Sequence, residues 1–240
     1  MIIKCGTKLP ALSQVPGDFE DWILNGMALG KAPAVTAAVH SDGKLPPPES
    51  VRGIVITGSS AMVTDNLPWI DRTRTWLTEA LAQSIPTLGI CFGHQLLAQA
   101  LGGRVDYNPT GIEVGTIRLR LADDVGFDPL FHGLARELSV QASHRQAVMT
   151  LPPEAVRLAS SDLDPNHAFR YRRHAWGLQF HPEFSHAAVK GYIENYRDQL
   201  DRTETSTEKL LDGSAESPVG ATLLKRFFTV IDETVRPSTS

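Results

Sequence analysis

Two short motifs in the chain combine residue types that could carry out acyl-transfer chemistry. The first is Gly89-Ile90-Cys91-Phe92-Gly93, which follows an apolar run and precedes a segment with helical spacing. This pattern is typical of a nucleophile elbow, where the glycines allow a sharp strand-to-helix turn that exposes the nucleophile. A helix N-terminus stabilises a thiolate, and its free N–H groups can bind an oxyanion. Cys91 is therefore a candidate nucleophile, and the alternative is an ordinary buried cysteine.

The second motif could supply the general acid that such a nucleophile needs. A thiolate that attacks an amide requires a proton donor for the leaving amine, and histidine is the usual choice. Of the eight histidines, His181 ends an apolar strand-like run and is followed by Pro182 and Glu183. In an extended turn, the Glu183 carboxylate can contact one ring nitrogen while the other faces the cysteine. We predict His181 as the acid–base and Glu183 as the residue that orients it.

Composition excludes several other classes of protein. The net charge is −4, and the only tight basic cluster is Arg170, Arg172 and Arg173, so we expect no nucleic-acid partner. The sequence shows neither a signal-like leader nor an apolar run long enough for a bilayer, which favours a cytoplasmic protein without a membrane partner. Cys5 lies in a first strand-like run and is expected to be a core residue. Metal-binding and phosphate-loop motifs are missing, so we expect no metal and no cofactor.

Apolar strand-like runs alternate with segments of helical spacing along the chain. This alternation predicts an α/β fold with a doubly wound, mostly parallel sheet and helices on both faces. The expected strands are 1–4, 34–40, 53–57, 87–90 and 175–180. The expected helices are 17–30, 67–83, 94–101 and 187–200.

Two further segments are expected to extend this fold. The alternating patterns of residues 114–121 and 137–142 predict an antiparallel addition to the sheet. We expect residues 1–200 to form one domain. Residues 201–240 are expected to form a C-terminal helical extension that packs on it through an apolar stripe.

The two motifs, in this order, resemble those of the class I, triad-type glutamine amidotransferases. Gly89 to Gln95 is similar to the family's cysteine motif, and Gly177 to Glu183 is similar to its His-x-Glu motif. The resemblance covers residues 50–200 and is closest to the amidotransferase domain of GMP synthases. It implies a flavodoxin-like fold. It also implies that Cys91 attacks the glutamine side-chain amide, that ammonia leaves, and that water hydrolyses the thioester.

The same resemblance implies further site residues. The backbone N–H groups of Ser59 and Phe92 would form the oxyanion hole, although Ser59 and Ser60 stand where the family usually has glycine and proline. Arg145 and Gln146 stand where the GMP synthase group usually has glycine and aspartate. The implied substrate contacts are Gly58, Gln95, Ser143, Arg145 and Gln146.

These residues leave more than one function open. The leading hypothesis is a glutamine-hydrolysing enzyme that supplies ammonia to a separate synthase or acts alone. A γ-glutamyl hydrolase would use the same three residues on γ-glutamyl amides or peptides. A regulatory or scaffold subunit would need none of them, which argues against a non-catalytic function. A fourth class of chaperone or peptidase proteins shares the elbow cysteine but lacks the strand-end His-x-Glu motif.

Overall fold

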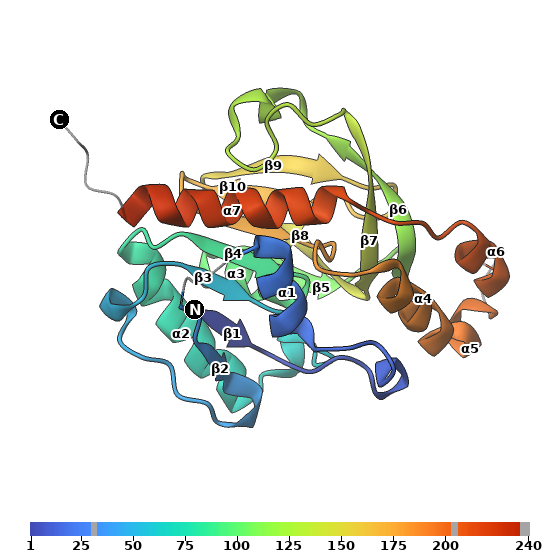
Figure 1. The fold of residues 1–240 in the computed structure, drawn as a ribbon, viewed down its shortest axis with the longest axis horizontal. Coiled ribbons are helices and arrows are strands. Elements are labelled where there is room, and N and C mark those ends of the chain that lie inside the picture. The colour runs from blue at the N-terminus through green and yellow to red at the C-terminus, as the bar shows by residue number, and fades with distance from the viewer. Residues whose placement is uncertain (30–32, 203–205, 236–240) are drawn as a thin grey trace.

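The computed structural model describes residues 1–29, 33–202 and 206–235 of the chain. Within these residues, nine strands form one sheet in the order β2-β1-β3-β4-β11-β10-β9-β6-β7, while β5 pairs separately with β8 (Figure 1). Neighbouring strands are parallel from β2 to β11. From β11 to β7 they are antiparallel. The sheet therefore has a parallel half and an antiparallel half that meet at β11.

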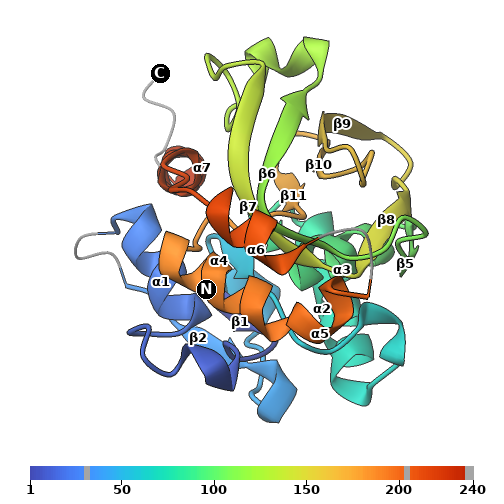
Figure 2. The same ribbon diagram turned by 90° about the vertical axis from the view of Figure 1, so that its right-hand side faces the viewer.

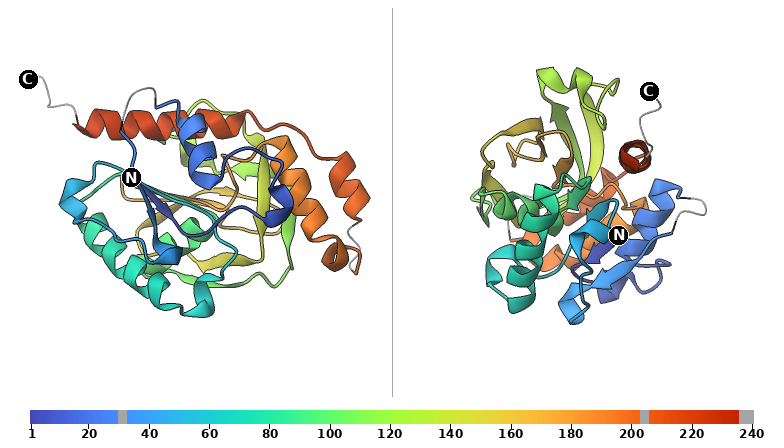
Figure 3. Two further views of the ribbon diagram at one scale, coloured as in Figure 1. Left: turned by 60° about the horizontal axis from the view of Figure 1, so that its bottom comes forward. Right: turned by 90° about the vertical axis from the view of Figure 1, so that its left-hand side faces the viewer.

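The strands of the parallel half are short, and the longest strands lie in the antiparallel half. Their bounds are β1 (Ile2–Lys4), β2 (Thr36–Ala38), β3 (Ile54–Ile56), β4 (Thr87–Ile90), β5 (Arg104–Tyr107), β6 (Glu113–Leu121), β7 (Glu137–His144), β8 (Gln146–Thr150), β9 (Ala155–Ser160), β10 (Ala168–Tyr171) and β11 (Ala175–Leu178). Strands β6 and β7 project beyond the rest of the molecule as a long green ribbon (Figure 3).

Helices cover both faces of the sheet. Helices α1 (Phe19–Met27) and α7 (Val219–Val235) share one hydrophobic cluster with β3, β4 and β11. Helices α2 (Pro68–Ala82) and α3 (Phe92–Ala100) share a second cluster on the opposite face. Figure 2, which looks along α7, shows the two pairs on opposite sides. The remaining helices are α4 (His186–Asn195), α5 (Arg197–Leu200) and α6 (Thr207–Asp212).

Strand β3 shows why the parallel strands read as continuous apolar runs. Successive side chains of a strand point to opposite faces of the sheet. Ile54 and Ile56 accordingly belong to the cluster with α2 and α3, while Val55 belongs to the cluster with α1 and α7. All three are buried because helices cover both faces, as expected for a parallel sheet. The predicted α/β fold with helices on both faces is thereby confirmed.

The antiparallel half was predicted in part. Strands β6 and β7 form the expected antiparallel pair, with Glu113 opposite His144 at one end and Arg120 opposite Glu137 at the other. Strands β5, β8, β9 and β10 were not predicted. They are short, and several of their positions are exposed, so they carry little of the apolar pattern that identifies a buried strand.

The C-terminal part of the chain contacts the main sheet through α7. Leu223, Leu224 and Phe227 are fully buried, and the Phe227 ring meets Trp176 of β11 edge to face, 6.1 Å between centroids. Helix α6 lies in the polar stretch before α7, within the expected helical extension. The division into residues 1–200 and 201–240 stays a prediction, and residues 203–205 and 236–240 of it lie outside the described residues.

Candidate active site

Cys91 lies between the last residue of β4 and the first residue of α3. Its backbone has φ 51° and ψ −104°, a left-handed conformation that costs free energy for a residue with a side chain. Its N–H still donates to Leu178 O over 2.8 Å, which ties the turn to the neighbouring strand β11. The turn therefore has the strained strand-to-helix geometry that characterises a nucleophile elbow.

The two glycines that flank Cys91 are required by close backbone contacts. A Cβ atom at Gly89 would lie 2.3 Å from the carbonyl oxygen of Gly93, and one at Gly93 would lie 2.4 Å from that of Ile56. Both distances are far below van der Waals contact. The first turn of α3 can therefore pack directly against β3 and β4 only with glycine at these two positions.

His181 and Glu183 form a buried pair beyond the end of β11. The His181 N–H donates to Gln141 O over 2.8 Å, which holds this segment against β7. His181 Nδ1–H donates to Glu183 Oε1 over 2.7 Å, and both side chains are almost fully buried. Phe184 stacks on the imidazole, with 3.8 Å between ring centroids and 16° between planes. The ring is therefore held by a carboxylate at one nitrogen and by an aromatic face.

The other ring nitrogen of His181 is free for Cys91, whose thiol is close enough to form a hydrogen bond. Burial by itself lowers the pKa of His181, but the charges of Glu183 and Cys91 and their hydrogen bonds raise it to about 10. A histidine with such a pKa stays protonated at neutral pH. The arrangement supports an imidazolium that lies between the Glu183 carboxylate and the sulfur of Cys91.

A pocket of about 220 Å³ opens in front of Cys91. A larger cavity of about 680 Å³ lies between α1 and α7 and is lined mainly by apolar side chains. The smaller pocket is the better candidate because it contains the elbow thiol. Its lining includes seven of the residues named from the sequence, namely Ser59, Cys91, Phe92, Gln95, Ser143, Arg145 and Gln146.

The remaining predicted residues lie directly behind this pocket. Gly58 is buried, and a Cβ there would be 3.1 Å from His181 Cε1 and 3.9 Å from Cys91 Cβ. A side chain at residue 58 would therefore crowd His181, while its Cβ would only touch Cys91. The structure brings together all ten residues that were named from the sequence, and their individual roles stay predictions.

Hydrogen bonds hold the polar wall of the pocket in place. The Cys91 thiol donates to Ser143 O at 3.6 Å. Gln95 Nε2 donates to Gln146 O over 2.8 Å and to Gln179 Oε1 over 3.0 Å. Both hydrogen bonds of the Gln95 amide nitrogen are therefore made within the protein. Gln95 supports the wall of the pocket at least as much as it could contact a substrate.

Several site residues were missed in the sequence analysis. Tyr196 and Asn195 of the α4 end line the pocket, and the Arg145 guanidinium lies 5.0 Å from the Tyr196 ring centre. Phe184, which stacks on His181, directly follows Glu183 in the chain. This adjacency is a sequence signal that could have identified Phe184 as a site residue. Nothing in the sequence pattern connects Tyr196 with Arg145, because the contact is made only by tertiary packing.

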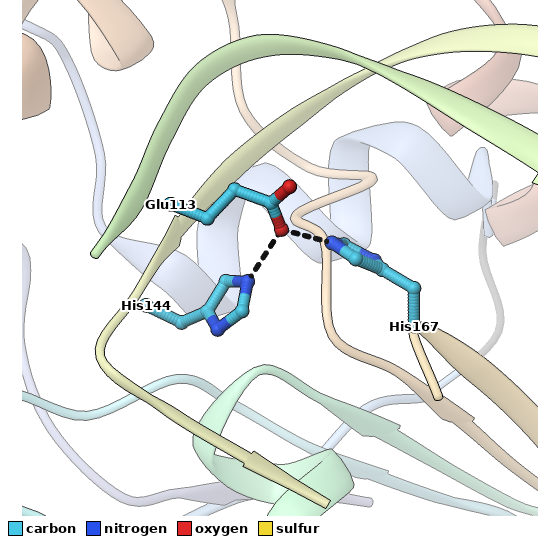
Figure 4. Close-up of side chains that lie close together, drawn as sticks. All are labelled: Glu113, His144 and His167. Carbon is cyan, nitrogen blue, oxygen red and sulfur yellow. Dashed lines mark hydrogen bonds and ion pairs between the residues drawn. The ribbon is translucent and has the colours of Figure 1, made fainter. Parts of the chain in front are cut away.

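A second buried cluster adjoins the pocket wall. Glu113, His144 and His167 bring three possible metal-ligand atoms within 4.8 Å of one another, the one such group among the described residues. Figure 4 shows both imidazoles directed at the same carboxylate oxygen. The sequence analysis did not name Glu113 or His167.

None of the helices in the described ranges is long and apolar enough to cross a membrane.

Comparison with known proteins gives the family to which this geometry belongs. A family model described as glutamine amidotransferase class-I matches residues 28–196, which is more than half of the chain. A Saccharomyces cerevisiae protein provisionally named a glutamine amidotransferase is 39% identical over 153 residues, or 62% of this chain. The chain spans only 59% of that relative's length.

Further relatives agree in fold and in sequence. One subunit of the glutamine-hydrolysing GMP synthase of Archaeoglobus fulgidus is 34% identical over 154 residues, covering 64% of this chain and 76% of that protein. A crystal structure of a Thermotoga maritima glutamine amidotransferase has a TM-score of 0.75 and 26% identity, covering 97% of this chain and 98% of that chain. The chain therefore belongs to the class I glutamine amidotransferases.

Proposed function

We propose that the chain hydrolyses the side-chain amide of L-glutamine through a thioester on Cys91. The observation that carries this proposal is the arrangement at neighbouring strand ends. The strained elbow at the end of β4 directs its thiol into the pocket, and the His181–Glu183 pair at the end of β11 lies beside it. A nucleophile, a base and the group that orients the base are the three parts that such chemistry needs.

In the proposed reaction, the Cys91 thiolate attacks the amide carbon and a tetrahedral oxyanion forms. The backbone N–H groups of Ser59 and Phe92 stabilise this oxyanion, since both residues line the pocket beside Cys91. His181 then donates its proton to the leaving nitrogen, the C–N bond breaks, and ammonia departs. Neutral His181 next takes a proton from water, which attacks the thioester and releases glutamate and the thiolate. Glu183 stabilises the imidazolium in both steps.

The charge of the pocket fits a substrate that carries a carboxylate. Arg145 is exposed at the pocket, and no acidic side chain is among the described residues that line it. We propose that the Arg145 guanidinium binds the α-carboxylate of the substrate, while Ser143 and Gln146 contact the α-amino group. The Tyr196 ring would hold the guanidinium in place through a cation–π contact.

The fate of the ammonia is proposed from the relatives. Several archaeal relatives are named as one subunit of a glutamine-hydrolysing GMP synthase, a name that implies a second, partner protein. We propose that this chain likewise supplies ammonia to a separate synthase. The acceptor of that ammonia does not follow from the residues of the pocket.

The first test is to measure ammonia and glutamate released from L-glutamine by the purified chain, beside a panel of γ-glutamyl dipeptides. We expect steady release from glutamine that requires Cys91. A strong preference for the dipeptides would instead favour a γ-glutamyl hydrolase, because the same thioester chemistry serves both substrates. Failure to release product from either substrate, although Cys91 reacts readily with iodoacetamide, would contradict autonomous hydrolysis.

Replacing Arg145 tests the proposed carboxylate contact. We expect Arg145→Gln to raise KM for the preferred substrate about tenfold or more and to change kcat little, since a lost charge-assisted hydrogen bond weakens ground state and transition state alike. Steady-state kinetics measure both constants. Arg118→Gln, which removes an exposed arginine that faces Glu137 on β7, is the matched control and should behave as wild type. An unchanged KM in Arg145→Gln would exclude the contact.

A further inference from the structure

Three buried ionisable side chains lie beside the pocket, one of them (His144) in its lining, and take no part in the proposed chemistry. Glu113 begins β6 and stands directly opposite His144, the last residue of β7. His167 precedes β10 and approaches the same carboxylate from another side (Figure 4). The exposed fractions of the three side chains are 5%, 1% and 0%. A charge at such a depth is stable only when other groups compensate it.

The hydrogen bonds determine where the protons of this cluster lie. Glu113 Oε2 lies 2.9 Å from His144 Nε2 and 2.9 Å from His167 Nε2. The other nitrogen of His144, Nδ1, lies 2.9 Å from the carbonyl oxygen of Gln146. A carbonyl oxygen can only accept, and an ionised carboxylate can only accept. Both nitrogens of His144 must then carry a proton, which makes this ring an imidazolium.

The third member keeps the cluster electrically neutral. His167 Nδ1 has no hydrogen-bond partner among the described residues, so His167 needs a single proton, on Nε2. One carboxylate, one imidazolium and one neutral imidazole sum to zero charge. A fully buried site can hold this balance, because no charge is left uncompensated.

The surrounding charges favour the same assignment. Burial alone lowers the pKa of His144, but the hydrogen bond and charge of Glu113, followed by the charges of Asp164 and Cys91, raise it overall. Burial alone raises the pKa of Glu113, but its two histidine partners bring that pKa well below the ordinary value. His94 nearby stays neutral, since burial, the largest cause, lowers its pKa to about 3.

The position of His144 connects this charge to the pocket. The Gln146 carbonyl that accepts from His144 also accepts from Gln95. On the other side of His144 in the chain, the Ser143 carbonyl accepts from the Cys91 thiol. The imidazolium therefore anchors the turn from residue 143 to residue 146. Ser143 on one side of His144, and Arg145 and Gln146 on the other, form the polar wall of the pocket.

We propose that His144 is an imidazolium, held by Glu113 and His167, which acts as a positioning residue for the wall that receives the γ-glutamyl group. The inference rests on the proposed function, since it assigns that group to the wall. It goes beyond the proposed function because it assigns an effect on substrate binding to a buried ion pair. The residues of this pair do not touch the reacting atoms.

The charge of His144 can be tested on the unmodified chain by NMR with ¹⁵N-labelled histidine. We expect one histidine other than His181 to show two protonated ring nitrogens from pH 6 to pH 9, and to lose one of these protons in Glu113→Gln. A wild-type spectrum in which only His181 is doubly protonated at pH 8 would overturn the proposal. This measurement does not require turnover, so it decides the inference even if the proposed function fails.

The positioning role predicts a separation of KM from kcat. Glu113→Gln keeps the size of the side chain but removes the anion, so His144 cannot hold both protons. We expect KM for the preferred substrate, glutamine or a γ-glutamyl dipeptide, to rise about tenfold, with kcat within about threefold of wild type. Iodoacetamide should label Cys91 at the wild-type rate, which shows that the elbow is intact. Glu154→Gln, which breaks an exposed pair with Arg172, is the matched control.

Three outcomes would overturn the proposal. Wild-type values of KM in a folded Glu113→Gln variant would show that the ion pair does not act on the pocket. A fall in kcat with unchanged KM would move the cluster into the chemistry itself. A stoichiometric divalent metal in the wild-type chain, measured by elemental analysis and lost in Glu113→Gln, would replace the bridging protons with a metal ion. If Glu113→Gln fails to fold, the wild-type NMR measurement still decides the charge.

Discussion

Cys91→Ala is expected to lower the rate of amide hydrolysis by at least about 10⁴-fold, because it removes the atom that would form the thioester. The fold should be unaffected, since the thiol is small and the elbow is held by backbone contacts of Gly89 and Gly93. Cys91→Ser should be almost as inactive, because a hydroxyl is much harder to ionise than a thiol. Steady-state ammonia release, together with circular dichroism of both variants, measures these effects.

The second cysteine provides a matched control. Cys5 is 1% exposed, and burial raises its pKa far above the ordinary value, so it is an inert core thiol. Cys5→Ala should retain activity and should still be labelled by iodoacetamide at Cys91. Mass spectrometry of the labelled peptides identifies the reactive residue. Substantial activity in Cys91→Ala, or labelling that moves to Cys5, would refute the proposed nucleophile.

His181→Ala is expected to cause the second large loss, about 10⁴-fold or more, because it removes the proposed proton donor to the leaving nitrogen. Glu183→Ala should retain about 10 to 100 times more activity than His181→Ala, since Glu183 orients and stabilises the ring but transfers no proton. The measurement is kcat of both variants on the preferred substrate. Equal activity of the His181→Ala variant and wild type would remove His181 from the mechanism.

The His181–Glu183 pair also gives a dependence on pH. The pKa of His181 is about 10 in the folded chain, above the value of about 6.5 expected for an unfolded histidine. The pair therefore contributes stability that is fully present below about pH 6.5 and is lost as the pH rises towards about 10. Glu183→Gln removes the anion and lowers the pKa of His181.

Urea unfolding measures this contribution directly. The difference in unfolding free energy between wild type and Glu183→Gln should be largest near pH 6 and should shrink as the pH approaches 10. His40→Gln changes a half-buried histidine that forms a hydrogen bond with Lys4 O and has no buried carboxylate partner among the described residues, so it should show no such trend. A constant difference across this range would show that the pair is not charged as described.

The local motifs were predictable because each depends on a few neighbouring residues. The elbow needs an apolar strand, glycines at two positions and a helix behind them, and all of these are consecutive in the chain. The His181–Glu183 contact also spans only two residues. Strand β3 could be identified because a short, continuous run of β-branched residues is typical of a parallel strand that helices cover on both faces.

The remaining site residues became visible only in the folded chain. Alternation in residues 114–121 and 137–142 indicates two strands and their faces, but it does not give their register, and a shift of one residue would separate Glu113 from His144. His167 and Tyr196 join the site from other elements, at long sequence separations. The sequence alone indicated the proposed nucleophile, its proposed base and the α/β class, because their signals are local. Tertiary packing decided the buried ion pair and the Arg145–Tyr196 contact, because strand register and helix docking choose partners that no local pattern encodes.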